Sequence, residues 1–192
     1  MKIIGITGSI GCGKTYLADI IRKLGFGVYN PDIWVRDLYK KESFLEIIKD
    51  NFPAVFEKDV FNKRKLRNLV FDDKKELKKL EALIHPLLKE KLKQLIRKNS
   101  IKNEILFLDV ALLFEMNWDI YCDYIIVADV DKNIQKQRVM KRDNVSETDF
   151  ENIIKNQESQ EIKKEKADIV INTGYSYGIN KVQLIKFIEE IL

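Results

Sequence analysis

Residues 8–15 read Gly8-Ser9-Ile10-Gly11-Cys12-Gly13-Lys14-Thr15, and they match the pattern G-x-x-x-x-G-K-[ST] at each fixed position. A short apolar run over residues 2–7 precedes this segment, and a stripe of apolar residues at helical spacing follows it. A strand, a glycine-rich loop and a helix in this order are typical of the phosphate-binding loop, or P-loop. With the full spacing and these flanks, a chance glycine-rich turn is the weaker interpretation.

The residue types in this loop suit the binding of phosphate groups. Gly8, Gly11 and Gly13 let the backbone wrap so that successive N–H groups face the phosphates, and the helix N-terminus adds partial positive charge. Lys14 can reach the β- and γ-phosphates, and the Thr15 hydroxyl can hold Mg²⁺. Cys12 is interpreted as a small residue that the loop tolerates, in preference to a thiol activated by the helix N-terminus.

Outward from the loop, short apolar runs alternate with helical stripes, which predicts an α/β fold with a five-stranded parallel sheet. The expected strands cover residues 2–7, 26–29, 104–109, 123–129 and 168–172. Leu17, Ile20, Ile21 and Leu24 recur on one face of the first helix, and Gly25 is its expected stop.

Further helices are expected from capping residues and apolar periodicity. Asp73 and Ser146 are each followed three residues later by an acid, which predicts helix starts at both. Pro86 is expected to end or kink the first of these helices near His85, and the last helix is predicted from Val182, Ile185 and Ile188. Residues 40–99 contain no predicted strand, so the chain is expected to be one domain with a helical insertion there.

Composition narrows the class of protein. In 192 residues, 45% are hydrophobic, and 34 basic residues stand against 30 acidic ones, a net charge of +4 without a long block of either sign. We therefore expect a folded chain without a nucleic-acid arm. Two cysteines cannot build a disulfide framework or a structural zinc site, and no run of 18 apolar residues exists, so we expect a cytoplasmic protein that does not span a membrane.

Asp109 is the second candidate group for nucleotide chemistry. It ends the apolar run Ile105-Leu106-Phe107-Leu108, at the sheet edge where open α/β folds bind ligands. This is the form of a Walker B aspartate, which holds Mg²⁺ directly or through water. Many strands also end in aspartate for reasons of turn geometry, but the P-loop nearby favours the metal role.

Among P-loop proteins, the sequence favours a kinase. The base-reading motif N-K-x-D of GTPases and a D-x-x-G switch are missing, and the chain is too short for a helicase or motor core. Asp32, after the second strand, is a candidate catalytic base. Arg138 and Arg142 are four residues apart on one helical face, where they form either a lid over the nucleotide or a solvated basic surface.

At this level of detail the sequence resembles the dephospho-CoA kinase family, P-loop enzymes that complete coenzyme A synthesis. The similarity extends over nearly the whole chain. The matching segments are residues 8–15, Asp32, Arg64-Lys65-Leu66, Val70-Phe71, residues 80–86, residues 108–115, Gln135, Arg138, Arg142-Asp143, Gln157, Lys163, Ala167-Asp168 and Ile171-Asn172.

The resemblance implies a nucleoside monophosphate kinase-like sheet, a helical substrate side over residues 40–99 and a lid over residues 135–160. It implies transfer of a phosphoryl group from ATP, with Mg²⁺, to the 3′-hydroxyl of dephospho-CoA, and no nucleic-acid, membrane or obligate protein partner. The implied catalytic residues are Asp32, Lys14 and Arg138. The implied ATP-binding residues are Gly8, Gly11, Cys12, Gly13, Lys14, Thr15, Tyr16, Arg138 and Arg142. The implied substrate residues are Asp32, Arg64, His85 and Leu113, and the implied metal residues are Thr15 and Asp109.

Three positions depart from the family pattern. Ala111 stands where the family usually has proline, Asn30 replaces the first acid of a D-x-D-like pair, and Pro53 replaces a usual glycine. None of them removes a group that the chemistry requires, although Ala111 and Pro53 bear on the substrate pocket. Two other functions stay open on the sequence: a kinase of the same architecture with another acceptor, and a nucleotide-binding regulator without catalysis.

Overall fold

The structure is a computed structural model that describes residues 1–99, 105–155 and 157–192. The chain forms two compact units. The first combines Met1–Asn30 with Asn99–Leu192, and the second is Pro31–Lys98. The predicted insertion over 40–99 falls largely in the second unit, which begins at Pro31.

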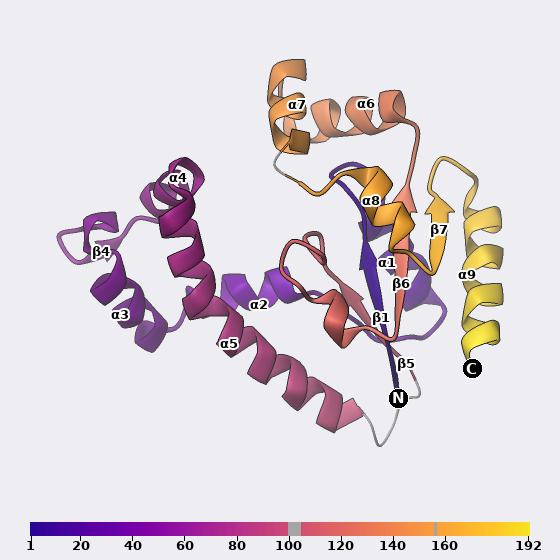
Figure 1. The fold of residues 1–192 in the computed structure, drawn as a ribbon, viewed down its shortest axis with the longest axis horizontal. Helices are drawn as coiled ribbons and strands as arrows, with labels where there is room; N and C mark the ends of the chain where they lie inside the picture. The colour runs from indigo at the N-terminus through magenta and orange to yellow at the C-terminus, as the bar shows by residue number, and fades with distance from the viewer. Residues whose placement is uncertain (100–104, 156) are drawn as a thin grey trace. The chain divides into compact units, whose positions relative to one another are not determined.

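The first unit is built on a five-stranded parallel sheet with the order β2-β5-β1-β6-β7 (Figure 1). The strands are β1 (Lys2–Thr7), β2 (Val28–Tyr29), β5 (Ile105–Asp109), β6 (Tyr124–Asp129) and β7 (Ile169–Asn172). The predicted parallel sheet is confirmed, although β2 starts two residues later than expected and Glu104 lies outside the described residues. Because the strands are parallel, the P-loop and the residues that follow β2, β5 and β7 all lie at one edge.

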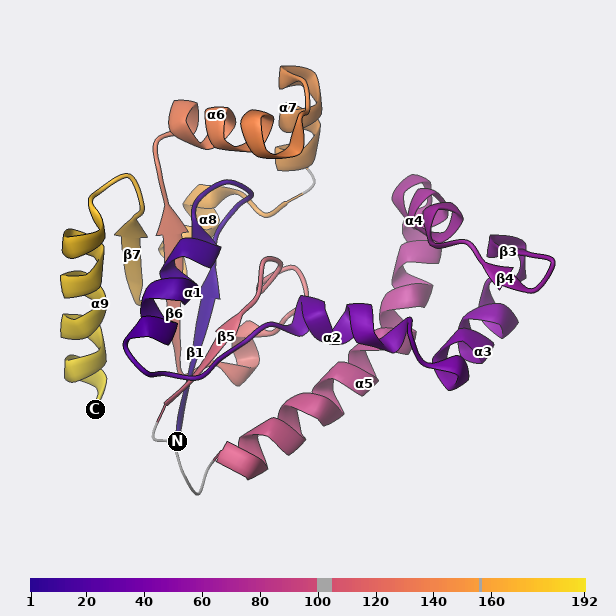
Figure 2. The same ribbon diagram turned by 180° about the vertical axis from the view of Figure 1, so that it is seen from behind.

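Helices cover both faces of this sheet. Figures 1 and 2 show α1 (Lys14–Lys23) on one face and α8 (Gln160–Glu165) on the other. Leu17, Ile20 and Ile21 of α1 are fully or almost fully buried in the core that contains the inner strands. As predicted, α1 stops at Gly25, whose φ of +94° is easy for glycine alone.

The last helix, α9 (Tyr177–Ile191), packs on the same core as α1 through a stripe that shares Ile188 with the predicted one. Its buried apolar residues are Leu184, Phe187, Ile188 and Ile191, spaced i, i+3, i+4 and i+7. Val182 is 52% exposed, so its place in the predicted stripe was wrong. A strict spacing of three residues, as in 182, 185 and 188, drifts around a helix of 3.6 residues per turn.

The predicted lid region contains two helices, α6 (Lys132–Asp143) and α7 (Glu147–Lys155). The Asp131 carboxylate caps α6 by accepting the N–H groups of Asn133 and Ile134. The predicted cap of α7 is present in full, because Ser146 Oγ accepts the Asp149 N–H while the Asp149 carboxylate accepts the Ser146 N–H, both at 3.1 Å.

The second unit is mostly helical. Its elements are α2 (Pro31–Leu38), α3 (Glu42–Asn51), the 3₁₀ turn η1 (Pro53–Val55), β3 (Phe56–Glu57), β4 (Val60–Phe61), α4 (Lys63–Asp72) and α5 (Lys74–Asn99). The antiparallel pair β3–β4 corrects the expectation that this segment contains no strand. Lys58 and Asp59, with φ of +47° and +65°, form its two-residue turn, and both positive φ values match the twist of a hairpin.

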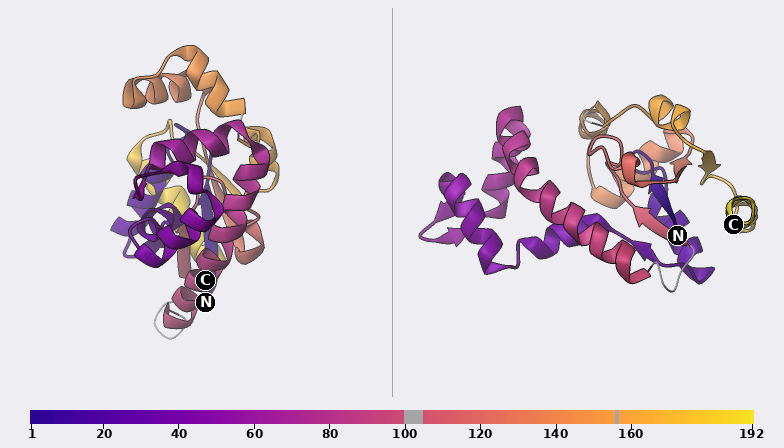
Figure 3. Two further views of the ribbon diagram at one scale, coloured as in Figure 1. Left: turned by 90° about the vertical axis from the view of Figure 1, so that its left-hand side faces the viewer. Right: turned by 60° about the horizontal axis from the view of Figure 1, so that its bottom comes forward.

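Helix α5 continues through Pro86, so the proline does not end the helix. Figure 3, like Figure 1, shows α5 changing direction partway along its length, as expected where proline removes a backbone hydrogen bond and crowds the preceding turn. At the start of α5, the Asp73 carboxylate accepts the Lys75 N–H at 2.7 Å, which supports the predicted helix start. In the described ranges, none of the helices combines the length and apolarity needed to span a membrane.

Candidate active site

The P-loop requires glycine at positions 11 and 13, because the backbone there has positive φ and leaves no room for a side chain. Gly11 has φ +79° and Gly13 has φ +91°, both in the left-handed region. A Cβ at Gly11 would lie 2.6 Å from Val139 Cγ2, and one at Gly13 would lie 2.6 Å from Thr173 Oγ1. The loop therefore packs with its backbone directly against helix α6 and the segment after β7.

The helix α1 begins directly after this loop and presents its N-terminus to the same region. Because the first N–H groups of a helix have no intrahelical partner, those of α1 are available to an anion. The Lys14 ammonium forms an ion pair with Asp109, whose side chain is almost fully buried. Asn30 Nδ2 also donates to the second Asp109 oxygen at 3.1 Å. The Asn30 departure therefore places an amide donor, rather than a second carboxylate, beside Asp109.

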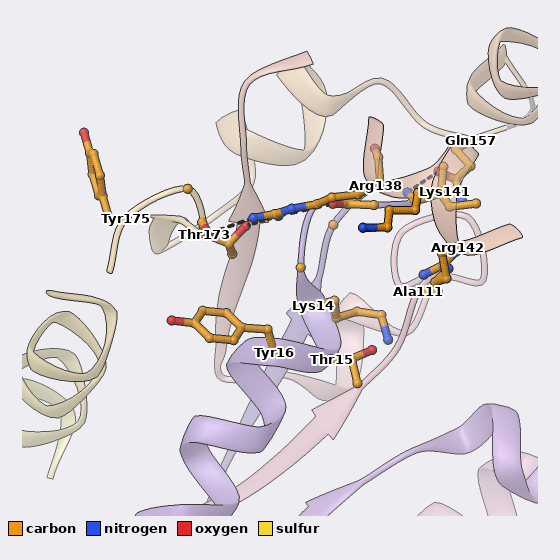
Figure 4. A pocket seen from close by; sticks show the side chains of 16 residues that line it. Lys14, Thr15, Tyr16, Ala111, Arg138, Lys141, Arg142, Gln157, Thr173 and Tyr175 are labelled. Carbon is orange, nitrogen blue, oxygen red and sulfur yellow. Dashed lines mark hydrogen bonds between the residues drawn. The ribbon is translucent and has the colours of Figure 1, made fainter. Parts of the chain in front are cut away.

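A cavity of about 1120 Å³ opens above the P-loop, entirely within the first unit (Figure 4). Its lining comes from the P-loop, the start of α1, the segments after β5 and β7, the C-terminal half of α6, and Gln157. The lining residues are Gly8, Ser9, Ile10, Gly11, Gly13, Lys14, Thr15, Tyr16, Ala111, Arg138, Lys141, Arg142, Gln157, Thr173, Gly174 and Tyr175. The structure therefore brings together most of the predicted nucleotide-binding residues in one pocket.

Arg138 is tied to the P-loop rather than solvated. Its guanidinium donates to Thr173 Oγ1 at 2.9 Å and to the Thr173 carbonyl at 3.1 Å, and it approaches the Gly11 carbonyl at 3.4 Å. Thr173 Oγ1 in turn donates to the Cys12 carbonyl at 2.7 Å. This network joins α6, the segment after β7 and the P-loop, so Arg138 is not part of a solvated surface. Its contact with a nucleotide stays a prediction.

Arg142 is held differently from Arg138. It is exposed, and it pairs with Asp143 through two hydrogen bonds of 2.8 and 2.7 Å. This partner raises the pKa of Arg142 and lowers the pKa of Asp143, so both stay charged. Arg142 nevertheless lines the cavity together with Lys141, which adds a second cation at the same end of α6.

Two predicted site residues have buried side chains. Cys12 is 1% exposed, and burial raises its pKa to about 12, so its thiol is neutral and does not line the cavity. Leu113 is fully buried, and a Cβ added at Gly5 would meet its Cδ2 at 3.1 Å. Both side chains therefore belong to the packed interior. The roles of Cys12 toward ATP and of Leu113 toward the substrate stay predictions.

The residues predicted for Mg²⁺ fit a hard cation. The exposed Thr15 hydroxyl lines the cavity, and the Asp109 carboxylate is bound to its neighbour Lys14. Mg²⁺ prefers oxygen ligands and is usually held by one or two protein groups together with phosphates and water. The described part of the chain contains no cluster of three or more acidic, histidine or cysteine residues that could hold a metal ion.

The remaining predicted residues lie in the second unit. Asp32 is exposed and lies in the first turn of α2, one residue after Pro31. An N-cap residue precedes the first residue of its helix, so Asp32 is not the N-cap of α2. Arg64 is exposed in the first turn of α4, and His85 is partly exposed in the middle of α5. Their roles toward the acceptor stay predictions.

No motif in the sequence predicts roles for Thr173, Lys141 or the glutamines around the P-loop. Three glutamines contact Ser9 and Ile10. The Ser9 N–H donates to Gln160 Oε1 at 3.1 Å, the Ile10 N–H donates to Gln157 Oε1 at 3.0 Å, and Gln135 Nε2 donates to the Ile10 carbonyl at 2.7 Å. Only the position of Thr173 directly after the last strand could have pointed to it.

Comparison with known proteins gives a consistent result over the full length. A family model described as dephospho-CoA kinase matches residues 2–177. The dephospho-CoA kinase of Bartonella quintana is 39% identical over 193 residues, covering 100% of this chain and 99% of its own. That of Fusobacterium nucleatum is 37% identical, covering 91% of this chain and 90% of its own.

Solved structures agree with these relatives. A Thermus thermophilus crystal structure superposes with a TM-score of 0.90 at 28% identity, covering 100% of this chain and 97% of its own. A dephospho-CoA kinase from Campylobacter jejuni superposes with a TM-score of 0.71 at 28% identity, covering 100% of this chain and 98% of its own. A deoxyadenosine kinase from M. mycoides, at 17% identity and a TM-score of 0.52 over 98% of this chain and 99% of its own, shares the fold alone.

Proposed function

The chain belongs to the dephospho-CoA kinase family, and from this premise we propose that it transfers the γ-phosphoryl group of ATP to the 3′-hydroxyl of dephospho-CoA, giving CoA and ADP. One observation carries the proposal most directly. The P-loop cavity gathers Lys14, Thr15 and Arg138, and Asp109 is bound beneath it to Lys14. Such a site supplies the cations and the metal-binding oxygens that phosphoryl transfer requires.

Nucleotide binding falls to the first unit. The N-terminus of α1 and the P-loop backbone would receive the phosphates, as helix N-termini and backbone N–H nests do for anions. Lys14 is paired with Asp109. The incoming phosphates would compete for Lys14 and release the Asp109 carboxylate toward a metal ion. The Thr15 hydroxyl and Asp109 would hold Mg²⁺, which when bound neutralises charge on the β- and γ-phosphates.

Charge stabilisation in the transition state falls to the cations around the cavity. Phosphoryl transfer proceeds through a loose transition state with charge on the equatorial oxygens, so fixed positive groups do most of the work. Lys14 would follow the transferring group from the P-loop side. Arg138 donates to Thr173 through two hydrogen bonds, which fix its guanidinium at the pocket wall. Arg142 and Lys141 extend this positive wall along the lid.

The acceptor side is proposed for the second unit. Asp32 would orient the 3′-hydroxyl and accept its proton, and Arg64 and His85 would contact the substrate. A carboxylate is a much weaker base than the alkoxide that it would generate, so the proton would leave late, as the new bond to phosphorus forms.

The test is a coupled assay of ADP formation against a panel of acceptors: dephospho-CoA, nucleosides, nucleoside monophosphates and shikimate. We expect turnover with dephospho-CoA at least 100-fold above every other acceptor. A preferred acceptor of another class would identify a kinase of the same architecture. ATP binding without turnover on any acceptor would identify a regulator, and both results would overturn the proposal.

A further inference from the structure

Gln157 and Gln160, which follow the lid helices, hold adjacent N–H groups of the P-loop. Gln157 Oε1 accepts the Ile10 N–H at 3.0 Å, and Gln160 Oε1 accepts the Ser9 N–H at 3.1 Å. Each carboxamide therefore uses its oxygen to fix the loop, and its amide nitrogen is the end that can donate elsewhere.

The amide nitrogens of the two glutamines differ in their surroundings. Gln160 Nε2 donates to the Ala128 carbonyl at 2.9 Å and to the Asp129 carboxylate at 3.0 Å. Gln160 lines a separate cavity of about 540 Å³ beside the loop. Gln157 instead lines the cavity above the loop, where its Nε2 has no protein acceptor among the described residues. Both ends of the Gln160 carboxamide are thus bonded within the protein, whereas Gln157 presents its Nε2 donor to the cavity above the P-loop.

The place of Gln157 in the cavity indicates which part of a nucleotide it meets. Figure 4 shows Gln157, Lys141, Arg142 and Ala111 at the end of the cavity away from Tyr175. Ala111 follows Asp109 by two residues, so this end is also the side of the expected metal ligand. Lys141 and Arg142 are two cations beside the neutral amide donor of Gln157, and this combination suits a phosphate group better than a purine base.

We propose that Gln157 is a phosphate-contacting residue, in which Oε1 holds Ile10 and Nε2 donates to the terminal phosphate of a bound nucleoside triphosphate. The proposal rests on the proposed function only for the identity of the nucleotide as ATP. Because the contact is made to the γ-phosphate, it distinguishes the triphosphate substrate from the diphosphate product. Gln157 then favours ATP over ADP at the same time as it fixes the P-loop.

Gln157→Glu separates the two ends of the side chain. A glutamate keeps an acceptor for the Ile10 N–H at nearly the same length, but it replaces the amide donor with a negative oxygen that repels phosphate. We expect ATP to bind this variant at least about tenfold more weakly, while ADP affinity changes by less than about threefold. Gln160→Ala is the matched control, since it removes a loop hydrogen bond at the neighbouring N–H without touching the cavity. It should weaken ATP and ADP by equal factors.

The experiment is calorimetric titration of ADP and of a non-hydrolysable ATP analogue, with Mg²⁺ and no acceptor, into wild type, Gln157→Glu, Gln157→Ala and Gln160→Ala. Selective loss of the ATP analogue in Gln157→Glu supports the contact. Wild-type affinity for both nucleotides, or equal loss of both, overturns it. Because no acceptor is present, this result does not depend on whether dephospho-CoA is the substrate. Failure of the wild type to bind either nucleotide would instead count against the proposed function.

A measurement on the wild type keeps the test independent of folding in the variants. The side-chain amide signals of Gln157, assigned by heteronuclear NMR, should shift with the ATP analogue and move much less with ADP. Equal shifts with both nucleotides, or no shift with either, would contradict the proposed contact.

Discussion

Replacing Lys14 with methionine removes the cation that neutralises Asp109, and it should lower both stability and turnover. Asp109 is 2% exposed, so its carboxylate has little access to water once Lys14 is gone. Removing one partner of a buried ion pair costs about 3–5 kcal/mol. The remaining hydrogen bond from Asn30 at 3.1 Å favours the lower end, about 3 kcal/mol. For a chain of this size, that corresponds to a fall in Tm of about 6–12 °C.

The double variant Lys14→Met/Asp109→Asn separates folding from catalysis. Removing the carboxylate together with the lysine leaves no unpaired buried charge, so most of the lost stability should return. Turnover should not return, because the transferring phosphoryl group still lacks its cation and the metal its carboxylate. We expect both variants to lose at least about 10² in kcat, which is the effect of removing one preorganised transition-state donor.

Thermal melts give the stability, and single-turnover rates give the activity, of wild type, Lys14→Met and the double variant. A Lys14→Met protein that melts like wild type would show that the pair does not stabilise the fold as argued. A double variant as unstable as the single one would refute the unpaired-charge explanation. Turnover within a few-fold of wild type in either variant would refute the assignment of the phosphate site.

Three further predictions concern other residues. Asp32→Asn should leave ATP affinity and melting nearly unchanged while single-turnover transfer falls by about 10²–10⁴, and a normal rate would remove Asp32 as the base. Arg138→Ala should lower both stability and kcat, because the Arg138 guanidinium donates hydrogen bonds to Thr173. Arg142 is exposed, so Arg142→Ala should stay within about 0.5 kcal/mol of wild type in urea unfolding and lose mainly activity. Equal effects of the two substitutions on stability would contradict this difference. Burial raises the pKa of Cys12 to about 12, so the folded state keeps the thiol proton at pH values where the unfolded state loses it. The free energy of unfolding of the wild type should therefore fall by about 1 kcal/mol between pH 9 and pH 10 because of this thiol. In urea unfolding, Cys12→Ala should show a correspondingly smaller fall, and an equal fall in both proteins would contradict this role of the thiol.

The sheet and the P-loop could be predicted because their signals are local in the sequence. The motif over residues 8–15 fixes residue types at set spacings, and the apolar runs before Thr7 and Asp109 mark buried parallel strands. The reciprocal cap of Ser146 and Asp149 was equally visible, since a capping box needs only four consecutive residues.

The hairpin β3–β4 was missed because its turn carries none of the usual residues. Two-residue hairpin turns with two positive φ values are normally marked by Asn-Gly or Asp-Gly, whereas this one uses Lys58-Asp59. With strands of two residues each, no alternation of apolar and polar residues could develop. Residues 56–61 therefore carry no pattern that predicts a strand.

The side chains that complete the site escaped prediction because tertiary contacts create them. Gln157 and Gln160 are distant in sequence from the loop that they hold, and an isolated glutamine has no spacing that predicts its partner. Leu113 is a different case, since only the family resemblance suggested it as a substrate residue, and its side chain packs into the core. In both cases, the direction of the side chain follows from packing rather than from local sequence.

The central claim is transfer to one particular hydroxyl, and a pair of modified acceptors tests it directly. The wild-type protein is mixed with ATP labelled at the γ-phosphate, Mg²⁺ and either 3′-deoxy- or 2′-deoxy-dephospho-CoA, and the label transferred to the acceptor is counted. The account predicts label in the 2′-deoxy acceptor, which keeps the 3′-hydroxyl, and none above background in the 3′-deoxy acceptor. Label in the 3′-deoxy acceptor, or in neither acceptor while dephospho-CoA is also unlabelled, would contradict it.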